Sequence, residues 1–270
     1  MIQFIKRIKK EQPEVELIVF GETILGWYFN ADNTEQYHQE IAEPIPGEIT
    51  DKLSEVAKSE KVYLSFGITE REGKSVYNSQ VILNTDGDII AVHRKFFARD
   101  KTFQTGKKPV TITEIKGLKI GLVICFDIRS NAVRKALMDS NADLIIHSMA
   151  DDEDPKFFGA GFLSRSFGTW YVTANHFGDE GGRFWNGHMF IAEPSGKLVI
   201  KGFNKEQYLY YEAVVKINES SFKKSVRKLI LKFSLVIHIL LHLKIAFGYV
   251  ADASKVRRRK RRENRNKKKN

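Results

Sequence analysis

Residues 119–129 read Lys119-Ile-Gly-Leu-Val-Ile-Cys125-Phe-Asp-Ile-Arg129 and mark the point where a strand passes into a helix. The five residues after Lys119 form an apolar run rich in β-branched side chains, which is typical of a buried strand. Residues 130–138, which follow, have a helix-like pattern. Because a buried strand that leads straight into a helix is typical of α/β proteins, we expect that fold class.

Cys125, the only cysteine of the chain, lies at this transition. A helix N-terminus offers unpaired N–H groups and a partial positive charge, which favour a thiolate and can hold an oxyanion beside the sulfur. That is the geometry that a cysteine nucleophile needs. An inert core thiol fits this stretch equally well, because free cysteine is among the most buried residue types.

The composition is that of a globular protein whose positive charge is concentrated at one end. A chain of 270 residues is long enough for one α/β domain with a large core. The formal net charge is +11, but residues 221–270 contain 17 Lys/Arg and 2 Asp/Glu, so the first 220 residues carry the remaining −4. A single cysteine excludes an internal disulfide framework, and no signal peptide is visible at Met1, so we expect a cytoplasmic protein.

Both strands and helices are predicted along the first 220 residues. Helices are predicted at 2–11, at 49–58 with Thr50 as the N-cap, and from 155 to about 167. Strands are predicted at 15–20, 61–68, 76–83, 89–95, 141–147, 170–175, 185–193, 197–202 and 208–216, with a loop at 179–182.

Two charged residues close predicted strands, as Cys125 does. Glu22 follows the strand at 15–20, and Lys95 ends the strand at 89–95. Strand ends are the usual place for functional groups in α/β sheets. Taken singly, however, each residue is more typical of a solvated charge at the start of a loop.

We predict no metal site. The acidic run Asp151–Asp154 lacks the alternating spacing of a calcium loop and is more typical of a solvated helix cap. His147, His176 and His188 show no ligand spacing, so we interpret them as structural or surface histidines.

Taken together, the three strand ends resemble the carbon–nitrogen hydrolases of the nitrilase superfamily. The motifs are Leu17-Ile-Val-Phe-Gly-Glu22, His93-Arg-Lys95 and Gly121-Leu-Val-Ile-Cys125-Phe-Asp-Ile-Arg129. Two further stretches, 163–175 and 186–196, resemble the segment after the nucleophile and the glycine-led hairpin of that family. The resemblance extends from about residue 14 to residue 216.

The resemblance implies a four-layer α-β-β-α sandwich and a Glu-Lys-Cys triad, with no metal or organic cofactor. Cys125 would be the nucleophile, Glu22 the general base and Lys95 the cation that stabilises the tetrahedral intermediate. The other expected oxyanion or substrate-binding residues are Phe126, Asp100 and Asp127. The family also implies a homodimer or a higher oligomer.

The chain departs from the family pattern in several places. It begins directly in the first helix, so we expect either that the usual first strand is missing and the strand before Glu22 lacks a neighbour, or that the chain is truncated. Gly21 stands where proline is common, which predicts a looser loop around Glu22. Asp100 is the nearest acid to the place where many members have a second glutamate, and Ser130-Asn131 replaces the more usual Phe-Pro.

We expect three parts: a carbon–nitrogen hydrolase domain at 1–220, an apolar or amphipathic helical extension at 221–250, and a disordered polybasic tail at 251–270. The longest uncharged run of the extension has 11 residues, too few for the ~20 that span a bilayer. A packing or dimer helix with a solvated, disordered end is the simplest interpretation. An aberrant extension is a further interpretation, since the composition changes sharply after about residue 216. An anionic membrane surface, which would make the protein peripheral, or a nucleic acid would also suit the charge.

The function predicted from these features is hydrolysis of a linear amide or carbamoyl C–N bond in a small molecule through a cysteine thioester. The alternative is a catalytically impaired member of the fold that binds a membrane surface or a nucleic acid. The missing strand, the changed motifs and the basic tail motivate this alternative.

Overall fold

The computed structural model describes residues 1–26, 33–98, 101–152, 157–180, 183–203 and 205–213. All of them lie within one compact unit, Met1–Glu219. The predicted extension at 221–250 and the predicted tail at 251–270 lie outside the described residues. In the described part, no helix is long and apolar enough to cross a membrane.

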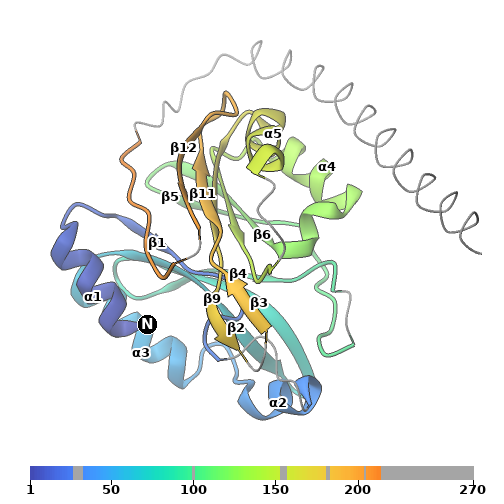
Figure 1. The fold of residues 1–270 in the computed structure, drawn as a ribbon. Coiled ribbons are helices and arrows are strands. Elements are labelled where there is room, and N and C mark those ends of the chain that lie inside the picture. Colours follow the sequence, from blue (N-terminus) through green and yellow to red (C-terminus); the bar gives the residue numbers. More distant parts are fainter. Residues whose placement is uncertain (27–32, 99–100, 153–156, 181–182, 204, 214–270) are drawn as a thin grey trace, which may run out of the picture. The chain divides into compact units, whose positions relative to one another are not determined.

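The first sheet has the strand order β1-β2-β3-β4 (Figure 1). Its strands are β1 (Leu17–Val19), β2 (Tyr63–Glu72), β3 (Ser75–Leu83) and β4 (Ile89–Arg94). β1 runs parallel to β2, and the other pairs are antiparallel. Within the described residues β1 has a single neighbour, β2.

The second sheet has the order β12-β11-β8-β7-β6-β5. Its strands are β5 (Thr111–Ile115), β6 (Leu118–Ile124), β7 (Leu144–Ser148), β8 (Trp170–Ala174), β11 (Met189–Ala192) and β12 (Leu198–Gly202). β6, β7 and β8 are parallel, so their carboxyl ends lie at one edge of the sheet. A separate antiparallel pair consists of β9 (Phe177–Glu180) and β10 (Arg183–Asn186).

Three apolar clusters show that these elements form four layers. The first joins α1 (Ile2–Glu11) and α3 (Glu48–Glu60) to the first sheet. The second joins the two sheets, with Ile82 and Ala91 on one side and Leu122 and Ile146 on the other. The third joins the second sheet to α4 (Asn131–Ser140) and α5 (Phe157–Phe167). A helix of eight residues, α2 (Thr34–Ile41), precedes α3. The α-β-β-α sandwich is therefore confirmed.

Thr50 is not the N-cap of α3, contrary to the prediction. The cap is Gly47, and the hydroxyl of Thr50 accepts a hydrogen bond from the Gly47 N–H (2.7 Å). Threonine therefore satisfies a backbone donor at the helix start from the third helical position, a role that local sequence does not distinguish from capping.

The predicted strand at 208–216 is also wrong for its described part, because residues 208–213 form no strand. The ring of Tyr208 instead packs edge-on against Phe4 of α1, and its hydroxyl donates to Glu11. The predicted strand at 185–193 is divided into β10 and β11, because Gly187 turns the chain at φ +67°. The predicted loop at 179–182 includes the end of β9, and residues 181–182 lie outside the described part.

The turn after β1 is held tightly between the two sheets, although Gly21 predicted a looser loop. The Gly21 carbonyl accepts a hydrogen bond from the Gly67 N–H (3.1 Å), and the Glu22 N–H donates to the carbonyl of Met149 (3.2 Å). A Cβ on Gly67 would lie 2.6 Å from the Gly21 oxygen and closer still to the backbone nitrogen of Thr23. Glycine at 67 therefore lets the turn approach β2.

We expect Gly67→Ala to displace this turn, because the added methyl meets backbone atoms that cannot move aside. The free energy of unfolding should fall by about 1–3 kcal/mol or more, measured by urea denaturation. Gly121→Ala is the matched control, because its methyl would meet side-chain atoms and no backbone, the nearest being the end of the Leu137 side chain at 3.2 Å. Equal stability of the two variants would contradict a close approach of the Glu22 turn to β2.

Candidate active site

Glu22 and Lys95 form a buried ion pair at the ends of strands of the first sheet. The Lys95 Nζ lies 2.5 Å from the Glu22 Oε1, and the two residues are 5% and 0% exposed. Glu22 follows β1, and Lys95 follows β4. Two charges this deep in the protein are stable only if hydrogen bonds compensate for the lost water.

The groups that provide this compensation surround Glu22. The side chain of Asn78, in β3, donates to Oε1 (2.6 Å), and the Ala150 N–H donates to Oε2 (3.1 Å). The backbone carbonyl of Glu22 accepts a hydrogen bond from His176 Nε2. Both carboxylate oxygens of Glu22 therefore have fixed donors, which sets the orientation of the carboxylate.

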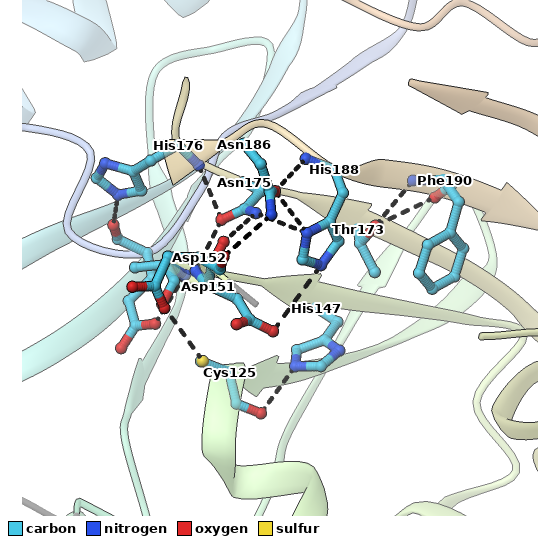
Figure 2. Close-up of polar contacts among 12 residues, drawn as sticks. Cys125, His147, Asp151, Asp152, Thr173, Asn175, His176, Asn186, His188 and Phe190 are labelled. Carbon is cyan, nitrogen blue, oxygen red and sulfur yellow. Dashed lines mark hydrogen bonds and ion pairs between the residues drawn. The ribbon is translucent and has the colours of Figure 1, made fainter. Parts of the chain in front are cut away.

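Cys125 lies just past the end of β6, in the second sheet. Its thiol faces Ala150, in the loop after β7. Its Sγ is 3.9 Å from the carbonyl oxygen of Ala150 (Figure 2). Ala150 thus contacts Glu22 through its N–H and Cys125 through its carbonyl. The structure therefore brings Glu22, Lys95 and Cys125 together, from three separate strand ends.

The backbone of Cys125 differs from the prediction in its local structure. Residues Cys125–Arg129 form a 3-10 helix, and α4 begins only at Asn131, so the thiol is not at the N-terminus of an α-helix. Cys125 has φ +40°, in the left-handed region that non-glycine residues rarely adopt. Its conformation must be held by the surrounding structure.

Burial raises the pKa of the Cys125 thiol well above its ordinary value, and the negative charge of Glu22 raises it further. The positive charge of Lys95 opposes this increase without overcoming it. The thiol is therefore protonated at neutral pH. The prediction of a stabilised thiolate did not include this desolvation, which outweighs the local dipoles.

The other predicted site residues have different surroundings. The Phe126 ring, next to the thiol in sequence, stacks on Phe97 at 5.6 Å and lies under the guanidinium of Arg129 at 4.8 Å. Asp100 lies outside the described residues.

Asp127 is fully buried, and its carboxylate binds groups of the protein itself. Oδ1 accepts the Phe97 N–H (2.6 Å), and Oδ2 accepts the Ile124 N–H (3.3 Å) and lies 3.3 Å from His93 Nε2. These contacts fix the 3-10 helix of Cys125 to the segment that follows Lys95. They are consistent with a positioning role for Asp127, and its contact with substrate stays a prediction.

A polar network holds the loop that carries Ala150 (Figure 2). The side chain of Asn175 accepts the Asp151 N–H (3.0 Å) and donates to the Asp151 carbonyl (2.9 Å). His188 Nε2 lies 3.8 Å from the Asp151 carboxylate, and burial lowers the pKa of His188. Asp152 pairs with Arg183 (2.8 Å). The loop after β7 is therefore tied to β8 and to the β9–β10 pair.

The three histidines interpreted as structural or surface residues are all buried and hydrogen-bonded. His147 binds the carbonyl of Cys125, His176 that of Glu22, and His188 the side chain of Asn186. Over the ranges that the structure describes, no group of three or more His, Cys, Asp or Glu side chains is arranged to hold a metal ion.

Sequence reasoning missed two groups that contact Glu22. Asn78 left a signal, because it is a polar residue within the apolar strand predicted at 76–83, and buried amides in strands need a specific partner. Ala150 left none, because it acts only through its backbone.

Comparison with known proteins places these features in context. The family model described as carbon-nitrogen hydrolase matches residues 1–216. An omega-amidase of Mus musculus is 28% identical over 207 residues, 70% of this chain and 74% of its own length. A nitrilase of Pyrococcus abyssi is 29% identical over 208 residues, 75% of this chain and 78% of its own.

Solved structures show the same fold. A carbon-nitrogen hydrolase from Helicobacter pylori aligns with a TM-score of 0.68 at 21% identity, over 76% of this chain and 79% of the other. A nitrilase-superfamily member from Saccharomyces cerevisiae aligns with a TM-score of 0.64 at 25% identity, over the same shares of the two chains.

The charges around the thiol predict how alkylation of Cys125 depends on pH. Because its pKa is raised, reaction with iodoacetamide should be slow at pH 7 and still accelerate above the ordinary thiol pKa of ~8.5. Glu22→Gln removes a charge that raises the pKa, so it should accelerate alkylation at pH 8. Lys95→Ala removes a charge that lowers the pKa, so it should slow alkylation.

Lys52→Ala is the control for this experiment, since Lys52 is exposed and pairs only locally, with Glu48. Its rate should equal that of the parent. A shift of the same sign in Glu22→Gln and Lys95→Ala would contradict the electrostatic account.

Asp127→Asn tests the positioning role of Asp127. The amide would turn an N–H₂ group toward backbone donors, so the free energy of unfolding should fall by about 1–3 kcal/mol. The exposed Asp139→Asn should change it by less than ~0.5 kcal/mol. Unchanged stability in Asp127→Asn, with a weakened apparent affinity for substrate, would instead favour direct substrate binding.

Proposed function

The chain belongs to the carbon-nitrogen hydrolase family, and from this premise we propose that it hydrolyses a linear amide through a thioester on Cys125. The observation that carries the proposal is the buried Glu22–Lys95 pair, held by Ala150 beside the thiol. A buried ion pair that perturbs the pKa of a nucleophile is typical of a catalytic site.

The first half of the proposed reaction forms the acyl-enzyme. Sγ of Cys125 attacks the carbonyl carbon while Glu22 takes the thiol proton, so no free thiolate has to accumulate. Lys95 and the Phe126 N–H stabilise the oxyanion, an effect of ~3–4 kcal/mol per donor in other acyl-transfer enzymes. Glu22 then gives the proton to the leaving nitrogen, the C–N bond breaks, and the thioester remains.

The second half releases the acid. Glu22 takes a proton from a water molecule that attacks the thioester, and the proton returns to the sulfur as the C–S bond breaks. The products are a carboxylic acid, ammonia or an amine, and the original thiol. This proposal requires only Glu22, Lys95 and Cys125 with backbone donors.

An amide is preferred to a nitrile as the substrate. Several relatives are described as omega-amidases, from vertebrates and from Saccharomyces cerevisiae, whereas one from Pyrococcus abyssi is described as a nitrilase. A carbamoyl compound shares the reacting C–N bond and is the second class to test.

The proposal predicts a covalent intermediate on Cys125. With a panel of small linear amides, the parent should release ammonia, and acid-quenched samples should show one acyl group on the Cys125 peptide by mass spectrometry. Cys125→Ala should lose at least about 1,000-fold in kcat/KM, and Lys95→Ala should lose about 100-fold or more.

Lys52→Ala, an exposed lysine outside the site, should retain the activity of the parent. Hydrolysis by Cys125→Ala at the rate of the parent would refute the cysteine mechanism. If no amide, carbamoyl compound or nitrile acylates Cys125, the alternative of a catalytically impaired binding protein takes precedence.

A further inference from the structure

The carbonyl of the nucleophile itself is held by a buried side chain pair. His147, near the end of β7, lies 2.9 Å through its Nε2 from the oxygen of Cys125 (Figure 2). The other ring nitrogen, Nδ1, lies 2.8 Å from the hydroxyl of Tyr171, in β8. The ring of Tyr171 stacks on Phe190 at 6.0 Å, which fixes the outer end of this chain of contacts.

The register of the strands explains why these residues meet. Val123 of β6 is opposite His147, and Cys125 is two residues further on, so it lies diagonally across from His147. Tyr171 is opposite Ile145, two residues before His147, so it lies diagonally on the other side. Residues two apart in a strand share one face, so His147 and Tyr171 lie on the same face of the sheet, and the chain that leaves β6 at Cys125 places its carbonyl within reach of His147.

The direction of each hydrogen bond follows from the donors available. A carbonyl oxygen only accepts, so His147 Nε2 carries a hydrogen and donates to Cys125. Burial lowers the pKa of His147, which keeps the ring neutral and leaves Nδ1 an acceptor. Burial also raises the pKa of Tyr171, so its hydroxyl stays protonated and donates to Nδ1.

The acidic side chains near His147 come from neighbouring elements and raise its pKa, whereas burial lowers it. Asp127, Glu22 and Asp151 each favour the protonated ring, but desolvation outweighs them. The neutral tautomer with hydrogen on Nε2 is therefore the form present at neutral pH.

The peptide group that His147 holds is the one that joins Cys125 to Phe126. Its carbonyl belongs to Cys125 and its N–H to Phe126, and the two lie in one plane. A donor on the carbonyl fixes this plane and polarises the N–H at its other end. It also supports the left-handed φ of +40° at Cys125.

We propose that His147, oriented by Tyr171, is a positioning residue that aims and polarises the Phe126 N–H toward the oxyanion of the acylation step. This inference rests on the proposed function, because it assigns a role within that reaction. His147 does not touch the substrate. It acts through the peptide plane of the nucleophile.

Two reactions of Cys125 separate this role from a general structural one. Alkylation by iodoacetamide displaces iodide and develops no oxyanion, whereas acylation by p-nitrophenyl acetate passes through a tetrahedral oxyanion. The ratio of the acylation rate to the alkylation rate therefore reports oxyanion stabilisation and requires no knowledge of the natural substrate.

The variants are His147→Leu, His147→Gln and Tyr171→Phe in the full chain. His147→Leu should lower the ratio about 10- to 100-fold. His147→Gln, whose amide nitrogen can replace Nε2 as the donor, should stay within about 3-fold of the parent, and Tyr171→Phe should fall between the two. Val56→Ala, a core substitution in α3, controls for lost stability and should leave the ratio unchanged.

The outcomes are distinct. A fall in acylation and alkylation by the same factor, or a ratio equal to that of the parent in His147→Leu, overturns the role of His147 alone. If His147→Leu does not fold, the ratio in Tyr171→Phe decides: a lowered ratio supports the role and an unchanged ratio overturns it. Absence of acylation in the parent overturns the proposed function, and this inference with it.

Discussion

The buried ion pair between Glu22 and Lys95 is the interaction on which the site depends. Removing two charges from water costs several kcal/mol per ion, and only close approach and further hydrogen bonds offset that cost. The first sheet supplies both charges and the amide of Asn78. The second sheet supplies the N–H of Ala150. The pair therefore receives its hydrogen bonds where the two sheets meet. The thiol lies at the same place, because Ala150, which donates to Glu22, also contacts the sulfur of Cys125.

The sequence predicted the parts of this arrangement that leave a pattern along the chain. Apolar strands that break abruptly at Glu22, Lys95 and Cys125 place each residue at a strand end, and the four layers follow from the family resemblance. The carboxyl ends of β1 and β6 carry two of these residues, as expected for α/β sheets. Tyr208 was misassigned to a strand because an aromatic run has the same pattern whether it joins a sheet or packs on a helix.

The protonation of Cys125 could not be predicted in the same way, because it depends on neighbours that are distant in sequence. A strand followed by a helix suggests a dipole that favours a thiolate. The structure instead removes the sulfur from water and brings the charge of Glu22 near it, and both changes raise the thiol pKa, although the contact with the Ala150 carbonyl acts in the other direction. Local sequence indicates which dipoles a residue faces, whereas desolvation is set by the packing of the whole fold.

The two sheets divide the proposed chemistry between them. Charge and proton transfer belong to the first sheet, through Glu22 and Lys95, whereas the nucleophile and the polarised backbone belong to the second, through Cys125, Ala150 and the His147–Tyr171 pair. Because the thiol stays protonated until it attacks, a proton must cross from one sheet to the other in the same step that forms the C–S bond. Two contacts join the sheets, the Glu22 N–H on the carbonyl of Met149 and Asp127 on the segment after Lys95, so we expect both to affect the rate of the proposed reaction.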